Sequence, residues 1–177
     1  MIRTALAATA LALATPTLAA LPVGAPAPDF STQGAMAGKT FQFSLAQALK
    51  KGPVVMYFFP AAFTKGCTIE TNAFADASED FKKAGATLVG VAADPIETLQ
   101  RFSTEACRSK FPVAVASPKM IADYDVKLPL MGRSNRTSFV IGKNGKIAYV
   151  HSDMKPDGHI TGTLAAVQAL GGRRATK

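Results

Sequence analysis

The chain has 177 residues, 48% of them hydrophobic, and its 20 lysines and arginines outnumber its 12 aspartates and glutamates to give a net charge of +8. This length favours one compact core over two domains. The basic charge could attract nucleic acid, but the pairs of basic residues are scattered and have no aromatic residues between them, which is typical of solvated surface charge. We therefore expect no nucleic-acid partner.

Residues 1–20 have the pattern of a secretory signal peptide. Arg3 supplies a positive charge, residues 5–14 form a short apolar stretch, and Pro16 precedes small residues suited to cleavage. The apolar stretch is much shorter than the roughly 20 residues that a membrane-spanning helix needs. The sequence therefore predicts export to a bacterial periplasm and a single mature domain over residues 21–177 that contacts no membrane.

The first half of the mature chain alternates between apolar runs and helical patterns. An extended, proline-rich segment over residues 21–30 precedes an alternating strand over residues 40–43 and a helix that Ser44 caps. Residues 54–59 and 86–92 are continuous apolar runs, which predict strands covered on both faces.

A helix is predicted between these two runs, over residues 64–83. Its positions 67, 70, 74, 77 and 81 share one face and hold Cys67, Glu70, Phe74, Ala77 and Phe81. The thiol and the carboxylate are therefore expected to face inward with the core side chains.

The second half of the chain predicts three further strands, two of them paired in a hairpin, and further helices. Asp94-Pro95-Ile96-Glu97 has the pattern of a helix cap and first turn, and opens a helix to Arg108 with Cys107 in its last turn. Asn144-Gly145 predicts a hairpin turn. The other predicted elements are a strand over residues 111–116, a helical turn over 118–124, hairpin strands over 137–141 and 146–151, and a helix over 160–170. The order predicts an α/β protein with a thioredoxin-like fold, in which helices flank both faces of a central mixed β-sheet.

Cys67 and Cys107 are the only cysteines, and for an exported chain the ordinary interpretation is a structural disulfide. The position of Cys67 favours another interpretation. The first turn of a helix offers unpaired backbone N–H groups and a positive dipole end, and both favour a thiolate. Thr64 and Glu70 occupy the positions three residues on either side, so a Cys-x-x-Cys exchange motif is excluded. A solitary thiolate suits attack on a peroxide.

Residues 60–67, PAAFTKGC, are similar to the P-x-x-x-T-x-x-C signature of the peroxiredoxins. The resemblance extends over residues 21–170, includes VGAPAPDF, CTIE and NRTSFVIGKNGKI, and is closest to the Q-type, or bacterioferritin comigratory, subfamily. It implies a thiol peroxidase for hydrogen peroxide and organic hydroperoxides that needs no cofactor and no metal. By the same resemblance Cys67 is the peroxidatic cysteine, Thr64 positions the peroxide, Pro60 shields the pocket, and Arg136 places its guanidinium beside the thiolate.

The residues themselves support part of this assignment. Arg136 opens the strand over residues 137–141, where its long side chain could reach the helix start and favour the thiolate; the alternative is a surface arginine, as Arg133 appears from sequence. Glu70 shares a stripe with core residues, so its charge would need a buried cation, and Arg136 is the candidate. Thr64 could also serve as an ordinary helix cap.

Cys107 is the candidate resolving cysteine, and its role stays open. Many Q-type members have that cysteine five residues after the first, where this chain has Asn72. The other arrangement in the subfamily places it on the next helix, where Cys107 lies. The alternatives are resolution by Cys107 after the start of the first helix unwinds, a permanent bridge, or an external thiol. The expected reductant is a thioredoxin-like dithiol protein, and a monomer is expected.

Other chemistries have less support. His151 and His159 lack the spacing of a metal site and are interpreted as surface or structural residues, and the Asn135-Arg136-Thr137 sequon is discounted because it overlaps the expected site. A thioredoxin-fold binding or chaperone module without turnover is the alternative function. A disulfide reductase is a third, and the missing Cys-x-x-Cys argues against it.

Overall fold

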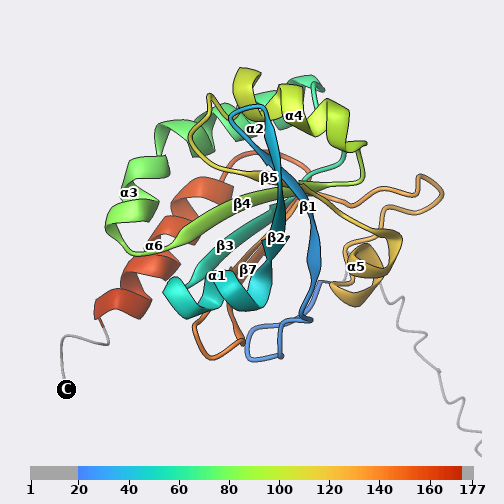
Figure 1. Cartoon of the computed structure of the whole chain (residues 1–177). Coiled ribbons are helices and arrows are strands. Elements are labelled where there is room, and N and C mark those ends of the chain that lie inside the picture. Colours follow the sequence, from blue (N-terminus) through green and yellow to red (C-terminus); the bar gives the residue numbers. More distant parts are fainter. Residues whose placement is uncertain (1–19, 173–177) are drawn as a thin grey trace, which may run out of the picture.

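The computed structural model describes residues 20–172 and builds them around one seven-stranded sheet (Figure 1). The strands are Ser31–Met36 (β1), Lys39–Ser44 (β2), Val54–Phe58 (β3), Thr87–Ala92 (β4), Val113–Val115 (β5), Thr137–Ile141 (β6) and Ile147–Ser152 (β7). The helices of this part of the chain are Leu45–Lys51 (α1), Lys65–Asp76 (α2), Ser78–Lys83 (α3), Ile96–Glu105 (α4), Pro118–Asp123 (α5) and His159–Gly172 (α6).

The sheet is mixed, with the strand order β2-β1-β5-β4-β3-β6-β7. Strand β3 lies between β4, to which it is parallel, and β6, to which it is antiparallel. Every residue of β3 is buried, as expected for a strand covered on both faces. The carboxyl end of β3 leads directly into residues 60–64 and then into α2, which carries Cys67.

Two hydrophobic cores form because side chains alternate across the strands. One core lies between the sheet and helices α2, α3, α4 and α6, and contains both cysteines. The other lies between the opposite face of the sheet and helices α1 and α5, together with part of the segment that precedes β1. Figure 1 shows these helices distributed over the two faces. The predicted mixed sheet with helices on both faces is therefore confirmed.

The structure departs from the sequence-based prediction at strand β1 and at the helix predicted over residues 64–83. Strand β1 was not predicted, because Ser31–Met36 is short of apolar residues and gains its place through pairing with β2 and β5. The predicted helix over residues 64–83 is two helices, α2 and α3, separated at Ala77. The hydroxyl of Ser78 donates to the carbonyl oxygen of Ala75 at 2.8 Å, so the break satisfies its own polar groups.

Most of the predicted signal peptide lies outside the described residues, which begin at Ala20. Among residues 20–172, no helix combines the length and the apolar composition required to cross a bilayer.

Candidate active site

Cys67 is the third residue of α2 and its side chain is 1% exposed. This position lies in the first turn, where backbone N–H groups have no partner within the helix. The preceding residue, Gly66, leaves room for a neighbour: a Cβ there would lie 3.2 Å from Nη2 of Arg136. The sulfur therefore lies at the positive end of the α2 dipole. The lack of a side chain at Gly66 allows the guanidinium of Arg136 to approach the start of this helix.

Arg136, immediately before β6, is the side chain that contacts the sulfur. Its Nη2 donates to Sγ of Cys67 at 3.4 Å, its Nη1 donates to Oε2 of Glu70, and its Nε donates to the carbonyl oxygen of Met154 at 3.0 Å. The guanidinium is 4% exposed. These three hydrogen bonds hold the planar guanidinium, and with it the positive charge, next to the thiol.

Glu70 lies one turn after Cys67 and is fully buried. Burial raises the pKa of the Glu70 carboxyl to about 8, although the charge of Arg136 and its hydrogen bond act in the opposite direction. The second carboxyl oxygen, Oε1, lies 3.6 Å from Nδ1 of His159, a distance too long for a hydrogen bond.

The connector from β3 to α2 carries an exposed hydroxyl, that of Thr64. Phe63 has φ of 62°, a left-handed conformation that is rare for a bulky residue, and its ring packs edge-on against Phe102. Thr64 follows at the N-cap position, but its side chain makes no capping hydrogen bond. It donates instead to the carbonyl oxygen of Ala61 at 3.0 Å. The lone pairs of this exposed hydroxyl therefore remain available to a ligand.

A buried carboxylate holds this connector against the end of β4. Asp94 accepts from the backbone N–H of Ala62 at 2.9 Å and from Nη1 of Arg133 at 3.2 Å. The same nitrogen of Arg133 donates to the carbonyl oxygen of Pro60 at 2.9 Å. Asp94 was predicted to cap α4, and that prediction is wrong, because Pro95 occupies the N-cap position. Arg133 is likewise half-buried and structural, rather than an ordinary surface residue.

His159 is a part of the site that the sequence did not reveal as such. It is fully buried, with Nδ1 2.8 Å from the hydroxyl oxygen of Ser138 and Nε2 3.0 Å from the carbonyl oxygen of Asp153. Burial lowers the pKa of His159 to about 4. The available signal was helical spacing, since His159, Thr163 and Val167 recur every four residues and are all buried on one face of α6.

The sequon at Asn135 has a structural role, because Asn135 is 1% exposed. Its Oδ1 accepts from the hydroxyl of Thr137 at 2.7 Å, and its backbone N–H donates to Val126. A buried asparagine is unavailable to a glycosyl group.

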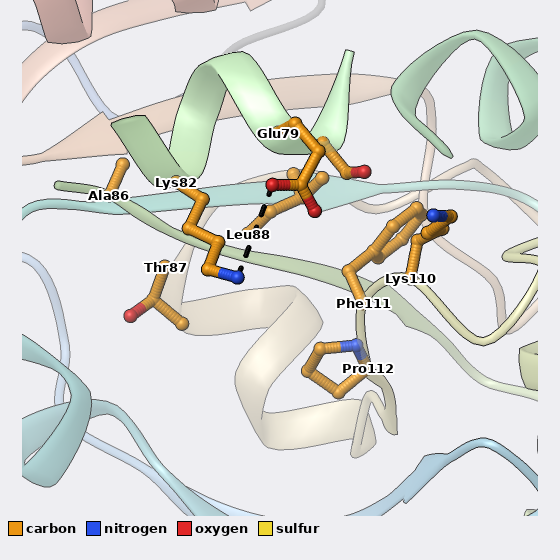
Figure 2. A pocket seen from close by; sticks show the side chains of 9 residues that line it. Glu79, Lys82, Ala86, Thr87, Leu88, Lys110, Phe111 and Pro112 are labelled. Atoms are coloured by element: carbon orange, nitrogen blue, oxygen red, sulfur yellow. Dashed lines mark ion pairs between the residues drawn. The ribbon is translucent and has the colours of Figure 1, made fainter. Parts of the chain in front are cut away.

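The hollow drawn in Figure 2 lies away from this cluster. Its volume is about 270 Å³, and it is lined by α3, the amino end of β4 and residues 110–112. The one ion pair drawn there joins Lys82 and Glu79, which are both exposed. Within residues 20–172, no three His, Cys, Asp or Glu side chains come together in a way that could hold a metal ion.

Comparison with known families decides the assignment. Residues 23–150 match the model of the AhpC/TSA family. The chain belongs to this family. Peroxiredoxin Q from chloroplasts of Oryza sativa subsp. japonica is 34% identical over 152 residues, which cover 83% of this chain and 67% of that protein. A peroxiredoxin of Mycobacterium tuberculosis strain H37Rv is 34% identical over 131 residues, covering 71% of this chain and 84% of that one.

Solved structures of the AhpC/TSA family share the fold. The crystal structure of peroxidoxin BcpB from Mycobacterium tuberculosis matches with a TM-score of 0.75 at 32% identity, over 83% of this chain and 96% of that chain. The AhpC structure of Mycobacterium tuberculosis, at 19% identity, has the same TM-score over 88% and 96% and supports the fold alone. The predicted thioredoxin-like fold and the predicted family are confirmed. This AhpC/TSA member is a peroxiredoxin, and it is a thiol-dependent peroxidase.

The second thiol of this peroxiredoxin, Cys107, lies just beyond α4 and is fully buried in the same core as Cys67. Both thiols are free. The predicted helix to Arg108 ends earlier, at Glu105, because Arg108 and Ser109 adopt left-handed conformations with φ of 50° and 55°. Burial raises the pKa of the Cys107 thiol far above its usual range, so this cysteine is protonated in the folded chain.

Proposed function

We propose that Cys67 is the peroxidatic cysteine, and that Arg136, Thr64 and Pro60 form its peroxide site with Glu70 in support. The observation that carries this proposal is the contact of Arg136 Nη2 with Sγ of Cys67 at 3.4 Å, inside a cluster shielded from water. A fixed guanidinium there favours the thiolate and can polarise a peroxide oxygen. The exposed hydroxyl of Thr64 can orient the peroxide, and Pro60, in the same connector between β3 and α2, can shield it.

The proposed first step balances as a two-electron transfer. The thiolate of Cys67 attacks the distal oxygen of ROOH, so that an S–O bond forms and the O–O bond breaks. Sulfur is oxidised to the sulfenic acid, and the leaving RO⁻ takes one proton to become the alcohol, or water when the substrate is hydrogen peroxide. No cofactor is required, because sulfur supplies both electrons.

The second proposed step is resolution by Cys107. Its thiolate attacks the sulfenic sulfur, hydroxide leaves as water after protonation, and a Cys67–Cys107 disulfide forms. Both sulfurs are buried and Cys107 is protonated in the folded chain, so we expect the start of α2 to unwind first. A thioredoxin-like dithiol protein then reopens the disulfide.

We also propose that the mature protein acts as an exported, periplasmic monomer. The charge and apolar pattern of residues 1–20 support export. Amino-terminal sequencing of protein secreted from a bacterial host would test the cleavage, and light scattering of the mature form would test the monomer. An uncleaved amino terminus would contradict the first claim, and a stable dimer would contradict the second.

The function is tested by peroxide consumption in the presence of a thioredoxin system. The protein should consume hydrogen peroxide and an organic hydroperoxide catalytically, and Cys67→Ser should abolish this turnover. Equal consumption by the Cys67→Ser variant would contradict the assignment and favour a binding module.

Mass spectrometry separates the routes of resolution. One equivalent of peroxide should convert the reduced protein to a Cys67–Cys107 disulfide, whereas Cys107→Ser should accumulate sulfenic acid at Cys67. A Cys107→Ser variant that turns over with thioredoxin as fast as the unaltered protein would show that an external thiol resolves the intermediate.

A further inference from the structure

Arg136 carries one positive charge and meets two acids in the protein interior. Its Nη1 donates to Oε2 of Glu70 and its Nη2 donates to Sγ of Cys67, while Nε is occupied by a backbone carbonyl. If both acids were ionised, the cluster would carry a net negative charge away from water, which costs several kcal/mol or more in a desolvated site. One of the two acids must therefore keep its proton.

The second oxygen of Glu70 indicates which acid keeps it. Oε1 is shielded from solvent and is the one buried side-chain oxygen or nitrogen among the described residues that has no hydrogen-bond partner. If Glu70 were ionised, Oε1 would carry part of the negative charge. Burying a charged oxygen without a hydrogen-bond partner strongly destabilises the folded state. A neutral carboxyl group removes this cost.

Nδ1 of His159 lies close to this oxygen. Its Nε2 lies 3.0 Å from the carbonyl oxygen of Asp153, which can only accept, so Nε2 carries the hydrogen. The one lone pair of the neutral ring is then on Nδ1, which accepts from the hydroxyl of Ser138 at 2.8 Å and lies 3.6 Å from Oε1 of Glu70. An ionised Oε1 would face this lone pair with repulsion, whereas a protonated Oε1 would face it with attraction.

We propose that Glu70 holds a proton on Oε1 near neutral pH, directed at Nδ1 of His159, and that the charge of Arg136 is thereby left to the sulfur of Cys67. In this arrangement Glu70 and His159 are positioning residues, because neither touches the peroxide. The proposal deepens the proposed function, and its consequence for Cys67 rests on that function.

The other titratable groups around the pair agree with this charge state. Tyr57 faces Glu70 from β3, and burial keeps its hydroxyl neutral by raising its pKa well above the usual value. His151 lies against His159, with ring centroids 4.4 Å apart. The positive charges of Arg136 and of a protonated His151 disfavour an imidazolium at His159, and the exposed Asp153 carboxylate opposes them weakly. The raised pKa of Glu70 and the lowered pKa of His159 have the directions that a proton on the carboxyl group requires.

The composition of the chain allows a direct measurement of this proton. There are four glutamates, and Glu79, Glu97 and Glu105 are exposed while Glu70 is buried. In carbon NMR of protein labelled at the glutamate carboxyl carbons, the Glu70 signal is the one that is missing in Glu70→Gln. This signal should titrate near pH 8. Titration of the Glu70 signal below neutral pH, or a protonated Nδ1 of His159 in nitrogen NMR near neutral pH, would overturn the proposal. The measurement needs neither peroxide nor turnover, so it can succeed or fail independently of the peroxidase assignment.

His159→Phe tests the acceptor separately from burial. Phenylalanine keeps the site dry and fills it, so an effect of burial alone would leave the Glu70 titration unchanged or move it upward. Loss of Nδ1 should instead move the Glu70 titration downward by up to about one pH unit, because an ionised Oε1 would no longer face a nitrogen lone pair. Ser138→Ala is the matched control, because it removes the competing donor and leaves Nδ1 free. The pKa of Glu70 in this variant should stay unchanged or rise. An upward shift in His159→Phe would overturn the role of His159.

The link to the sulfur is tested by alkylation of reduced protein near neutral pH. His159→Phe should slow the reaction of Cys67 with iodoacetamide, because an ionised Glu70 then competes for Arg136. The same change made in a Glu70→Gln background should cause no further slowing, since the amide cannot ionise. Equal slowing in both backgrounds would show a merely structural effect and would overturn the coupling.

Discussion

Arg136 is the residue on which the geometry at Cys67 depends most. Each of its three guanidinium nitrogens donates to a different partner, and the partners come from α2 and from the segment that follows β7. The arginine therefore joins two parts of the chain that are far apart in sequence. It also joins the reacting sulfur to the buried Glu70 and, through that carboxyl group, faces His159.

Arg136→Lys should lower the second-order rate of Cys67 oxidation by peroxide by about 10- to 100-fold. A lysine keeps the charge but replaces the fork by one nitrogen, and each lost hydrogen bond to a charged group is worth about 1.5–3 kcal/mol. Competition of the variant with a peroxidase of known rate measures the effect. Arg133→Lys is the control, since Arg133 holds the connector rather than the sulfur, and an equal loss in both variants would contradict the account.

Gly66→Ala should affect stability and reactivity in opposite directions. Alanine is favoured over glycine within a helix by about 1 kcal/mol, so the free energy of unfolding should hold or rise. The new methyl group would lie 3.2 Å from Nη2 of Arg136 and should push the guanidinium away from the sulfur, so that oxidation of Cys67 becomes slower. Denaturant unfolding and stopped-flow oxidation measure the two effects.

Gly171→Ala is the matched control for this substitution. It also lies in a helix, and nothing stands within 4 Å of the added Cβ. Faster or unchanged oxidation in Gly66→Ala would show that the close approach of Arg136 is unimportant for the reaction.

At the scale of elements, α2 must be firm enough to hold Cys67 at Arg136 and loose enough to release it to Cys107. One buried hydrogen bond fastens its second turn to the sheet: the hydroxyls of Tyr57 and Thr71 are 3.0 Å apart. Strand β4 provides the space for the phenol ring, because a Cβ at Gly90 would lie 2.7 Å from it.

Tyr57→Phe should accelerate disulfide formation after Cys67 has been oxidised. The lost hydrogen bond stabilises the folded α2 by about 1 kcal/mol, so the unwound form should become up to about fivefold more populated. Rapid quench followed by mass spectrometry of the Cys67–Cys107 linkage measures the rate. A slower or unchanged rate would show that α2 opens without releasing Thr71.

The sequence predicted well the elements whose patterns are local. Continuous apolar runs located β3 and β4, Asn144-Gly145 located the hairpin of β6 and β7, and Ser44 caps α1 as its sequence indicates. Strand β1 escaped prediction because partner strands, rather than its own composition, hold it in place. The break between α2 and α3 was not predicted either, because the two helices share one apolar face and therefore have the pattern of a single helix.

The residues around Cys67 were predictable to the extent that a local motif contains them. The PxxxTxxC segment is contiguous, and helical spacing placed Glu70 on the buried face. Asp94, Arg133 and His159 reach the site from the end of β4, from the segment before β6 and from α6. Their convergence is set by sheet order, which spacing along the chain does not encode, and so Asp94 was misread as a cap.

At the scale of the whole molecule, the buried side chains of Glu70 and His159 make the free energy of unfolding depend on pH. The pKa of Glu70 rises from 4.5 to about 8 on folding, so its contribution is present in full below pH 4.5 and is lost as the pH rises through 8. The pKa of His159 falls from 6.5 to about 4, so its contribution is present above pH 6.5 and is lost as the pH falls through 4. The two trends oppose each other between pH 4.5 and 6.5, and of these two residues only Glu70 acts from 6.5 to 8.

The free energy of unfolding should therefore fall between pH 6.5 and 8 relative to that of Glu70→Gln. One proton bound in the folded state and absent in the unfolded state corresponds to about 1.4 kcal/mol per pH unit. Urea unfolding of both proteins at several pH values in this interval isolates the contribution. Parallel curves for the two proteins would contradict a raised pKa at Glu70.

The most direct test compares the two thiols of the chain under identical conditions. Cys107→Ser leaves Cys67 alone and Cys67→Ser leaves Cys107 alone, so stopped-flow oxidation of each reduced variant by hydrogen peroxide reports one sulfur. We predict that Cys67 reacts at least about a hundredfold faster, equivalent to about 3 kcal/mol of transition-state stabilisation from α2 and Arg136. Comparable rates for the two sulfurs would contradict the account.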